Sequence, residues 1–142
     1  MAISVKVTRN TPQLDRYIKG LKEVDPITQK AAIKLQGDLL TAYARGGNLS
    51  SRDTNKRLTS DYREKKRESG RRGIRDLNVT GDLIRSFRVV KEAFASYSTG
   101  PRGTKNQAKM AGNLKYDENL MKVSRKNKQV ITDFIKKLLL GG

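Results

Sequence analysis

The first residues of the chain alternate between apolar and polar side chains. Ile3, Val5 and Val7 are each separated by one polar residue. This period of two is typical of a strand with one buried face. The pattern therefore predicts a strand over residues 2–9.

Two signals for the start of a helix follow this strand. Thr11 precedes Pro12, and Asp25 precedes Pro26. In each pair the polar side chain can cap free amides, and proline suits the first helical turn. The first pair predicts a helix that the second pair interrupts.

The longest predicted helix covers residues 26–45. Apolar side chains recur there at every fourth position and form one continuous ridge, and two consecutive glycines end the pattern. This helix should cover one face of a sheet. The ridge consists of Ile27, Ala31, Leu35, Leu39 and Tyr43.

The segment after this helix is poor in apolar residues. Ser, Asp, Asn and Arg dominate residues 48–59, so we expect an extended loop or arm that adds little to a core. Residues 61–68 can form a helix whose narrow apolar side includes Tyr62, and Gly70 is its stop signal. We expect residues 46–76 to project from the domain as a basic arm.

Aromatic and branched residues then return and predict two strands. The strands cover residues 86–91 and 93–99, and a hairpin around Lys91 and Glu92 would join them. Residues 100–103 form a turn because they contain two glycines and a proline.

The C-terminal third is less regular until its last element. Residues 104–112 are weakly helical, and a fourth strand near residues 114–123 is one interpretation of an ambiguous stretch. Ser124 then caps a helix over residues 125–140, whose apolar residues recur at helical spacing.

These elements predict a single α+β domain over residues 1–142. We expect a small, mainly antiparallel sheet that is packed by the long helix at 26–45 and by the C-terminal helix at 125–140. A chain of 142 residues fits one domain. The sequence indicates neither an internal repeat nor a linker between domains.

The chain contains neither cysteine nor histidine. Their absence excludes disulfides, thiolate zinc sites, a cysteine nucleophile and a Ser-His-Asp triad. It also removes the side chain that titrates near neutral pH without perturbation. We therefore expect a protein that is not an enzyme, with no catalytic, cofactor-binding or metal-binding residue.

Basic residues outnumber acidic residues by 31 to 14, which gives a formal net charge of +17. Such a charge attracts phosphate backbones or acidic protein surfaces, and added salt weakens the attraction. The N-terminus lacks the apolar block of a signal peptide, and no apolar run is long enough to cross a bilayer. We expect a protein made in a cytoplasm, without membrane contact.

A Thr-Gly motif marks the change from polar sequence to the predicted strands. Residues 77–87 read Leu-Asn-Val-Thr-Gly-Asp-Leu-Ile-Arg-Ser-Phe. Thr80 can cap a helical turn, Gly81 permits a tight backbone approach, and Leu83 can anchor the segment to the core. Ser86 completes the Thr-Gly-x-Leu-x-x-Ser spacing. From spacing alone, the segment is a capped turn before a strand.

The motif and the order of elements around it resemble a family of phage proteins. A long helix, a basic segment, the Thr-Gly motif and paired strands follow one another as in lambdoid tail-completion proteins and Mu-like virion-morphogenesis proteins. Residues 107–113 resemble the small-residue segment that lies downstream in that family. The similarity covers residues 27–123.

This resemblance implies a structural virion protein of the phage neck or tail, made in the host cytoplasm. Such a protein forms a homo-oligomeric ring, sixfold or twelvefold, that contacts other neck, portal or tail-tube proteins. It would join the capsid connector to the tail, as a tail-completion, terminator or head-tail connector subunit. Rings of this kind are built from repeated heterologous interfaces.

The basic residues of the predicted arm allow three interpretations. They could form a solvated helix face, dock against an acidic protein surface, or grip phosphates without reading sequence. A small basic nucleic-acid-binding protein is the main alternative function, and a neck ring could also contact DNA non-specifically. The residues are Arg63, Lys65, Lys66, Arg67, Arg71, Arg72 and Arg75.

Overall fold

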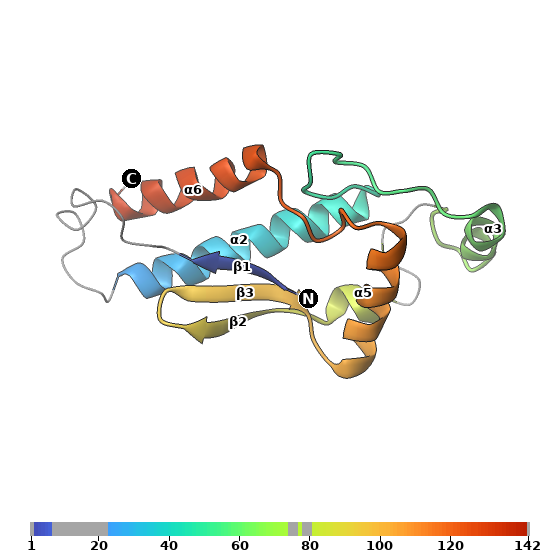
Figure 1. Ribbon diagram of the computed structural model, residues 1–142, viewed down its shortest axis with the longest axis horizontal. Coiled ribbons are helices and arrows are strands. Elements are labelled where there is room, and N and C mark those ends of the chain that lie inside the picture. Colours follow the sequence, from blue (N-terminus) through green and yellow to red (C-terminus); the bar gives the residue numbers. More distant parts are fainter. Residues whose placement is uncertain (1, 7–22, 74–76, 78–80, 142) are drawn as a thin grey trace.

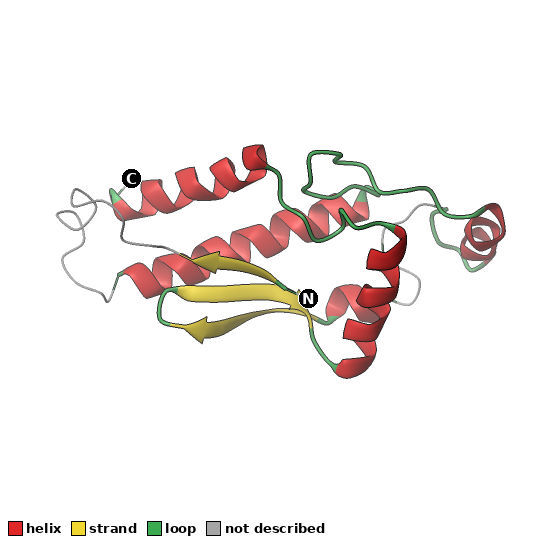
Figure 2. Cartoon of the chain, viewed as in Figure 1, coloured by secondary structure: helices red, strands yellow, loops and turns green. Residues whose placement is uncertain are grey.

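The computed structural model describes residues 2–6, 23–73, 77 and 81–141. Among these residues, five helices and one three-stranded antiparallel sheet confirm the predicted α+β class (Figure 2). The elements in chain order are β1 (Ile3–Lys6), α2 (Val24–Ala44), α3 (Ser60–Glu68), α4 (Asp82–Arg85), β2 (Phe87–Ala93), β3 (Ser96–Pro101), α5 (Thr104–Tyr116) and α6 (Arg125–Leu139).

Helix α2 lies between the sheet and α6. It contacts all three strands on one side and α6 on the other (Figure 1). The sequence predicted that both long helices pack with the sheet, and Ile131 of α6 lies in the same buried cluster as Val5 of the sheet. The buried residues of α2, among them Ala31 and Ala32, recur at the i, i+3, i+4 and i+7 spacing of one continuous stripe. This stripe belongs to the same core as residues of the sheet and of α6.

The sheet has the order β1-β3-β2, with every neighbouring pair antiparallel. Ile3 and Val89 both pair with Thr99 of the central strand. The Thr99 hydroxyl donates to the Gln36 side chain of α2 at 2.6 Å, so this face of the sheet is the one that α2 covers. Strand β1 agrees with the predicted strand at 2–9 as far as Lys6. The remainder of that strand and the predicted helix from Thr11 lie outside the described residues.

The turn between β2 and β3 lies later than predicted, at Phe94 and Ala95 rather than around Lys91 and Glu92. Strand β2 continues to Ala93, with a register shift between Lys91 and Ala93. Ala95 has a left-handed φ of 52°, a conformation that its residue type rarely favours. Its amide donates to the Asp25 carboxylate of α2 at 2.9 Å. This tertiary contact accounts for a turn that the local sequence does not signal.

The fourth strand suggested near residues 114–123 is wrong. Helix α5 continues to Tyr116, and a turn follows before α6. Ser124 caps α6 as predicted, since its side chain accepts a hydrogen bond from the Asn127 amide. Leu120 and Met110 from this region are fully buried, so the segment contributes to the core through a helix and a turn.

Tyr43, near the end of α2, connects the helix to this C-terminal segment. Its ring is fully buried and meets Phe87 edge-on, with ring centroids 6.0 Å apart. Its hydroxyl donates to the Leu120 carbonyl at 2.5 Å. Burial raises the pKa of the Tyr43 phenol well above its usual value, so the hydroxyl remains a proton donor at all ordinary pH values.

Removal of this hydroxyl should destabilise the fold. We expect Tyr43→Phe to lower the free energy of unfolding by about 1–3 kcal/mol, because the buried Leu120 carbonyl loses its donor. Urea denaturation of the two proteins measures the difference. Tyr62→Phe is the matched control, since Tyr62 is 45% exposed, and its effect should be small. Equal effects at the two positions would contradict this role of Tyr43.

Asp25 should make stability depend on acid pH. Hydrogen bonds from the Tyr97 hydroxyl and the Ala95 amide, together with Lys91, lower the pKa of Asp25 to about 2. The ionised carboxylate therefore stabilises the fold fully above its unfolded pKa of about 3.9, and this contribution is lost as the pH falls towards 2. Between pH 4 and 2, the free energy of unfolding should fall more steeply for the unmodified chain than for Asp25→Asn.

Denaturation at a series of pH values measures both slopes. Asp133→Asn, on the exposed side of α6, is the control and should retain the slope of the unmodified chain. An Asp25→Asn protein with an unchanged slope would contradict the assignment.

Candidate functional site

The first part of the predicted arm is not an arm. Residues 46–50 are buried, and Leu49 belongs to the main hydrophobic core. The Asn48 side chain donates to Asn55 at 2.8 Å and accepts from the Ser50 amide at 2.9 Å. The sequence suggested an extended loop because the segment is polar. These polar groups are instead buried with hydrogen-bond partners, which makes their burial tolerable.

The projecting part, here called the basic arm, consists of residues 56–73. Its start is fixed by the Lys56 amide, which donates at 2.8 Å to the buried carboxylate of Asp117. Near its other end, the Arg72 guanidinium donates to the Ala44 carbonyl at 2.8 Å, where a cation also suits the C-terminal end of α2. Between these two attachments, α3 lies at one end of the long axis of the molecule (Figure 1).

Helix α3 confirms the predicted helix at 61–68, and it divides the basic residues into different environments. Gly70, with a φ of 79°, follows its end as predicted. Lys66 is 3% exposed and lies on the inner side, whereas Arg63 is half-buried. The basic run is therefore not one uniform cationic face. The exposed members are Lys65, Arg67, Arg71 and Arg72, and Arg75 lies outside the described residues.

The Thr-Gly motif forms a tight turn into β2. Gly81 has a φ of 82° and precedes the one-turn helix α4. Leu83 is buried in the main core, and the Ser86 hydroxyl donates to the Leu83 carbonyl at 2.6 Å. The Ser86 carbonyl accepts from the Arg102 amide, which ties the motif to the end of β3. Thr80 lies outside the described residues.

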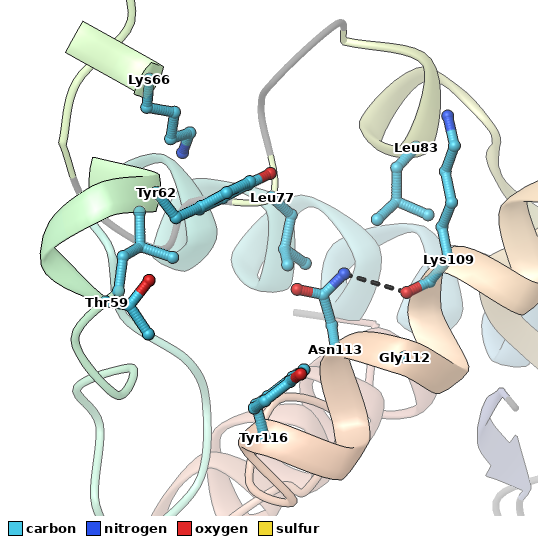
Figure 3. A pocket seen from close by; sticks show the side chains of 10 residues that line it. Thr59, Tyr62, Lys66, Leu77, Leu83, Lys109, Gly112, Asn113 and Tyr116 are labelled. Carbon is cyan, nitrogen blue, oxygen red and sulfur yellow. Dashed lines mark hydrogen bonds between the residues drawn. The ribbon is translucent and has the colours of Figure 1, made fainter. Parts of the chain in front are cut away.

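The arm and the motif meet at a pocket of about 630 Å³, here called the arm pocket. Figure 3 shows its residues on three sides of one hollow. The side formed by the arm comprises Leu58, Thr59, Tyr62 and Lys66. The side formed by the motif region comprises Leu77 and Leu83. The side formed by α5 comprises Lys109, Gly112, Asn113 and Tyr116.

The arm pocket is suited to binding an apolar group that has a polar or acidic neighbour. Its surface is mainly apolar, with three leucines and two tyrosines in the lining, and its volume lies within the range of sites that take small ligands or side chains. Its described lining contains two lysines and no acidic residue. Asn113 donates to the Lys109 carbonyl at 2.9 Å (Figure 3), so its side chain is held against α5.

Within residues 2–6, 23–73, 77 and 81–141, no group of three or more acidic residues is placed to hold a metal ion. None of the helices in these ranges has the length and apolar content needed to span a bilayer.

The sequence predicted no pocket, although it singled out residues from two of the three sides of the arm pocket. Tyr62, on the predicted narrow apolar side of the arm, and Leu83, from the motif, both line it. The contribution of α5 was missed because residues 113–123 had no clear periodicity. The one sequence feature that pointed to this part of the pocket was Gly112. It lies within the segment at 107–113 that resembles the downstream part of the phage family.

The left-handed conformation of Gly81 gives a direct test of the motif. An added Cβ would be strained at this φ and would lie 3.0 Å from the Arg85 guanidinium. Gly81→Ala should therefore cost roughly 1–2 kcal/mol in the free energy of unfolding. Gly37→Ala in α2 is the control, because a Cβ there meets nothing within 4 Å and alanine should stabilise the helix by about 0.5–1 kcal/mol. Urea denaturation measures both, and a stabilising Gly81→Ala would contradict the assigned turn.

The structure thus brings the basic arm, the Thr-Gly motif and α5 together around one pocket. The chain matches no family model, no curated protein and no solved structure. The functional interpretation rests on the geometry of this pocket, on the arm and on the sequence resemblance.

Proposed function

We propose that this protein is a structural subunit of a phage neck or tail that assembles into a homo-oligomeric ring. In this role it joins the capsid connector to the tail, as a tail-completion, terminator or head-tail connector protein, and it has no catalytic function. The observation that carries the proposal is the basic arm, which extends from the body of the domain and presents α3 at the end of the molecule (Figure 1). The Thr-Gly resemblance supports the same role.

The arm is only weakly supported by its own chain. Helix α3 has nine residues, fewer than the ~12–15 that an isolated helix needs to be even marginally stable in water. Its one large apolar side chain, Tyr62, is 45% exposed. A helix of this kind gains most of its stability from packing, so a neighbouring subunit is a natural source of the missing contacts.

The distribution of charge on α3 favours a protein partner over nucleic acid. Acidic residues alternate with the basic ones along the helix, at Asp61, Glu64 and Glu68. Lys66 lies on the inner side and Arg72 binds the end of α2. Phosphate backbones are best matched by a continuous cationic surface, and α3 does not provide one. The net charge of +17 nevertheless favours nucleic-acid binding as the second candidate function.

The proposal is tested by measuring the mass of the protein in solution, for the unmodified chain and for a variant with an altered arm. The unmodified chain should form closed oligomers as its concentration rises in analytical ultracentrifugation. Replacement of Lys65, Arg67 and Arg71 by glutamine should weaken self-association about tenfold, because exposed ion pairs contribute about 0.5 kcal/mol each. The control replaces three exposed lysines of α6 by glutamine and should leave assembly nearly unchanged. These lysines are Lys126, Lys128 and Lys136.

Two results would contradict the proposal. One is a chain that remains single at every concentration and binds duplex DNA or RNA tightly at physiological salt. That result would favour the small basic nucleic-acid-binding protein. The other is an equal loss of assembly in the arm variant and the α6 variant, which would assign the effect to total charge and not to the arm.

A further inference from the structure

An exposed aromatic side chain lies at the tip of the β2–β3 hairpin. Phe94 is 50% exposed, and its neighbours along the chain are the small residues Ala93 and Ala95. The tip is held firmly, since the Ala95 amide donates to Asp25 at 2.9 Å and the Tyr97 hydroxyl donates to the same carboxylate at 2.7 Å. A rigid tip that carries one large apolar group loses little conformational entropy when it binds.

The hairpin tip and the arm pocket lie towards opposite ends of the molecule. In Figure 1, whose horizontal direction is the longest axis, α3 lies at one end and the turn between β2 and β3 lies towards the other. A protruding group at one end and a recess at the other form a heterologous pair. Contacts of this kind generate a ring when the rotation between copies closes.

The segments beside the hairpin tip and beside the arm pocket also differ in charge. Residues 23–25 and 91–96, which surround the hairpin tip, contain three acidic residues and one basic residue in a chain with a net charge of +17. Glu23 and Glu92 are exposed. The opposite end contains the six basic and three acidic residues of segment 60–73, in addition to Lys109 of the arm pocket. Complementary charge of this kind sets orientation and speeds encounter.

We infer that the Phe94 hairpin tip of one copy docks into the arm pocket of the next copy. This inference rests on the ring proposed above and names the contact that builds it. The Phe94 ring lies among Tyr62, Leu77 and Leu83 of the neighbour, and Glu92 lies near Lys109. The contact orders α3 at the same time, because the neighbour's hairpin covers the inner side of the arm.

Two substitutions remove the two halves of this contact separately. Phe94→Asp removes the apolar group and leaves the arm pocket intact. Gly112→Leu fills the arm pocket and leaves the hairpin tip intact. A Cβ at Gly112 meets nothing within 4 Å, so the substitution should not disturb α5. Each variant should weaken self-association at least about thirtyfold, as expected for loss of a central aromatic anchor.

The two variants must then be mixed. At the lowest concentration at which the unmodified chain assembles, each variant alone should remain a single chain, but together they retain one complete contact between the tip of Gly112→Leu and the pocket of Phe94→Asp. The equimolar mixture should form a pair of chains and no larger species, as measured by native mass spectrometry. Gly37→Leu and Val130→Asp are matched controls, because Gly37 is also an open helical glycine and Val130 is also exposed, at 42%. Both controls should form the same oligomer as the unmodified chain, and thermal melting checks that all variants fold.

The outcomes separate this contact from the ring itself. If the unmodified chain forms rings and either variant still forms them, the docking contact is wrong while the proposed ring stands. If each variant is a single chain but the mixture shows no pair, the docking contact is also wrong. If the unmodified chain never assembles, the contact and the proposed function both fail.

Discussion

Burial of one continuous stripe of α2 against the sheet and α6 is the constraint on which the rest of the structure depends. Leu35 and Leu39 belong to a core that also contains Val5 of the sheet, and Phe134 of α6 packs against the same core. The small apolar content of the chain, 35%, is concentrated around this one helix. Little apolar surface is left to hold the more distant elements.

This concentration explains why the arm and the hairpin tip are available for contacts with other molecules. The arm is attached through polar groups, at Asp117 and at the Ala44 carbonyl. The hairpin tip is attached through Asp25. Hydrogen bonds fix the positions of both elements, and the two large apolar side chains Phe94 and Tyr62 stay half-exposed. Phe94 and Tyr62 therefore remain exposed at opposite ends, and the molecule has the two unlike surfaces that repeated end-to-end contacts need.

The sequence predicted the parts of the fold that depend on local periodicity. Helices α2 and α6, the paired strands and Gly70 as the end of α3 all follow from spacing or from a single turn residue. The missed features depend on contacts between distant residues. Asp25 fixes the turn at Ala95 from 70 positions away, and no local signal marks it.

Local sequence patterns predicted neither the burial of the polar loop at residues 46–50 nor the arm pocket, for related reasons. Asn48 and Asn55 are buried because they satisfy one another, and a hydropathy pattern counts both as exposed. Leu83 was identified through the Thr-Gly motif, but its position opposite Tyr62 depends on how the arm folds back. Gly112 has no side chain and therefore leaves room in the arm pocket. This room depends on which residues face Gly112 in the folded chain, so the local sequence does not indicate it.

The most direct test of the central claim is an electron micrograph of the purified, unmodified protein at high concentration. The account predicts closed rings with one uniform number of subunits, in which neighbouring copies meet end to end. Isolated single chains under these conditions, or particles formed only along added nucleic acid, would contradict it.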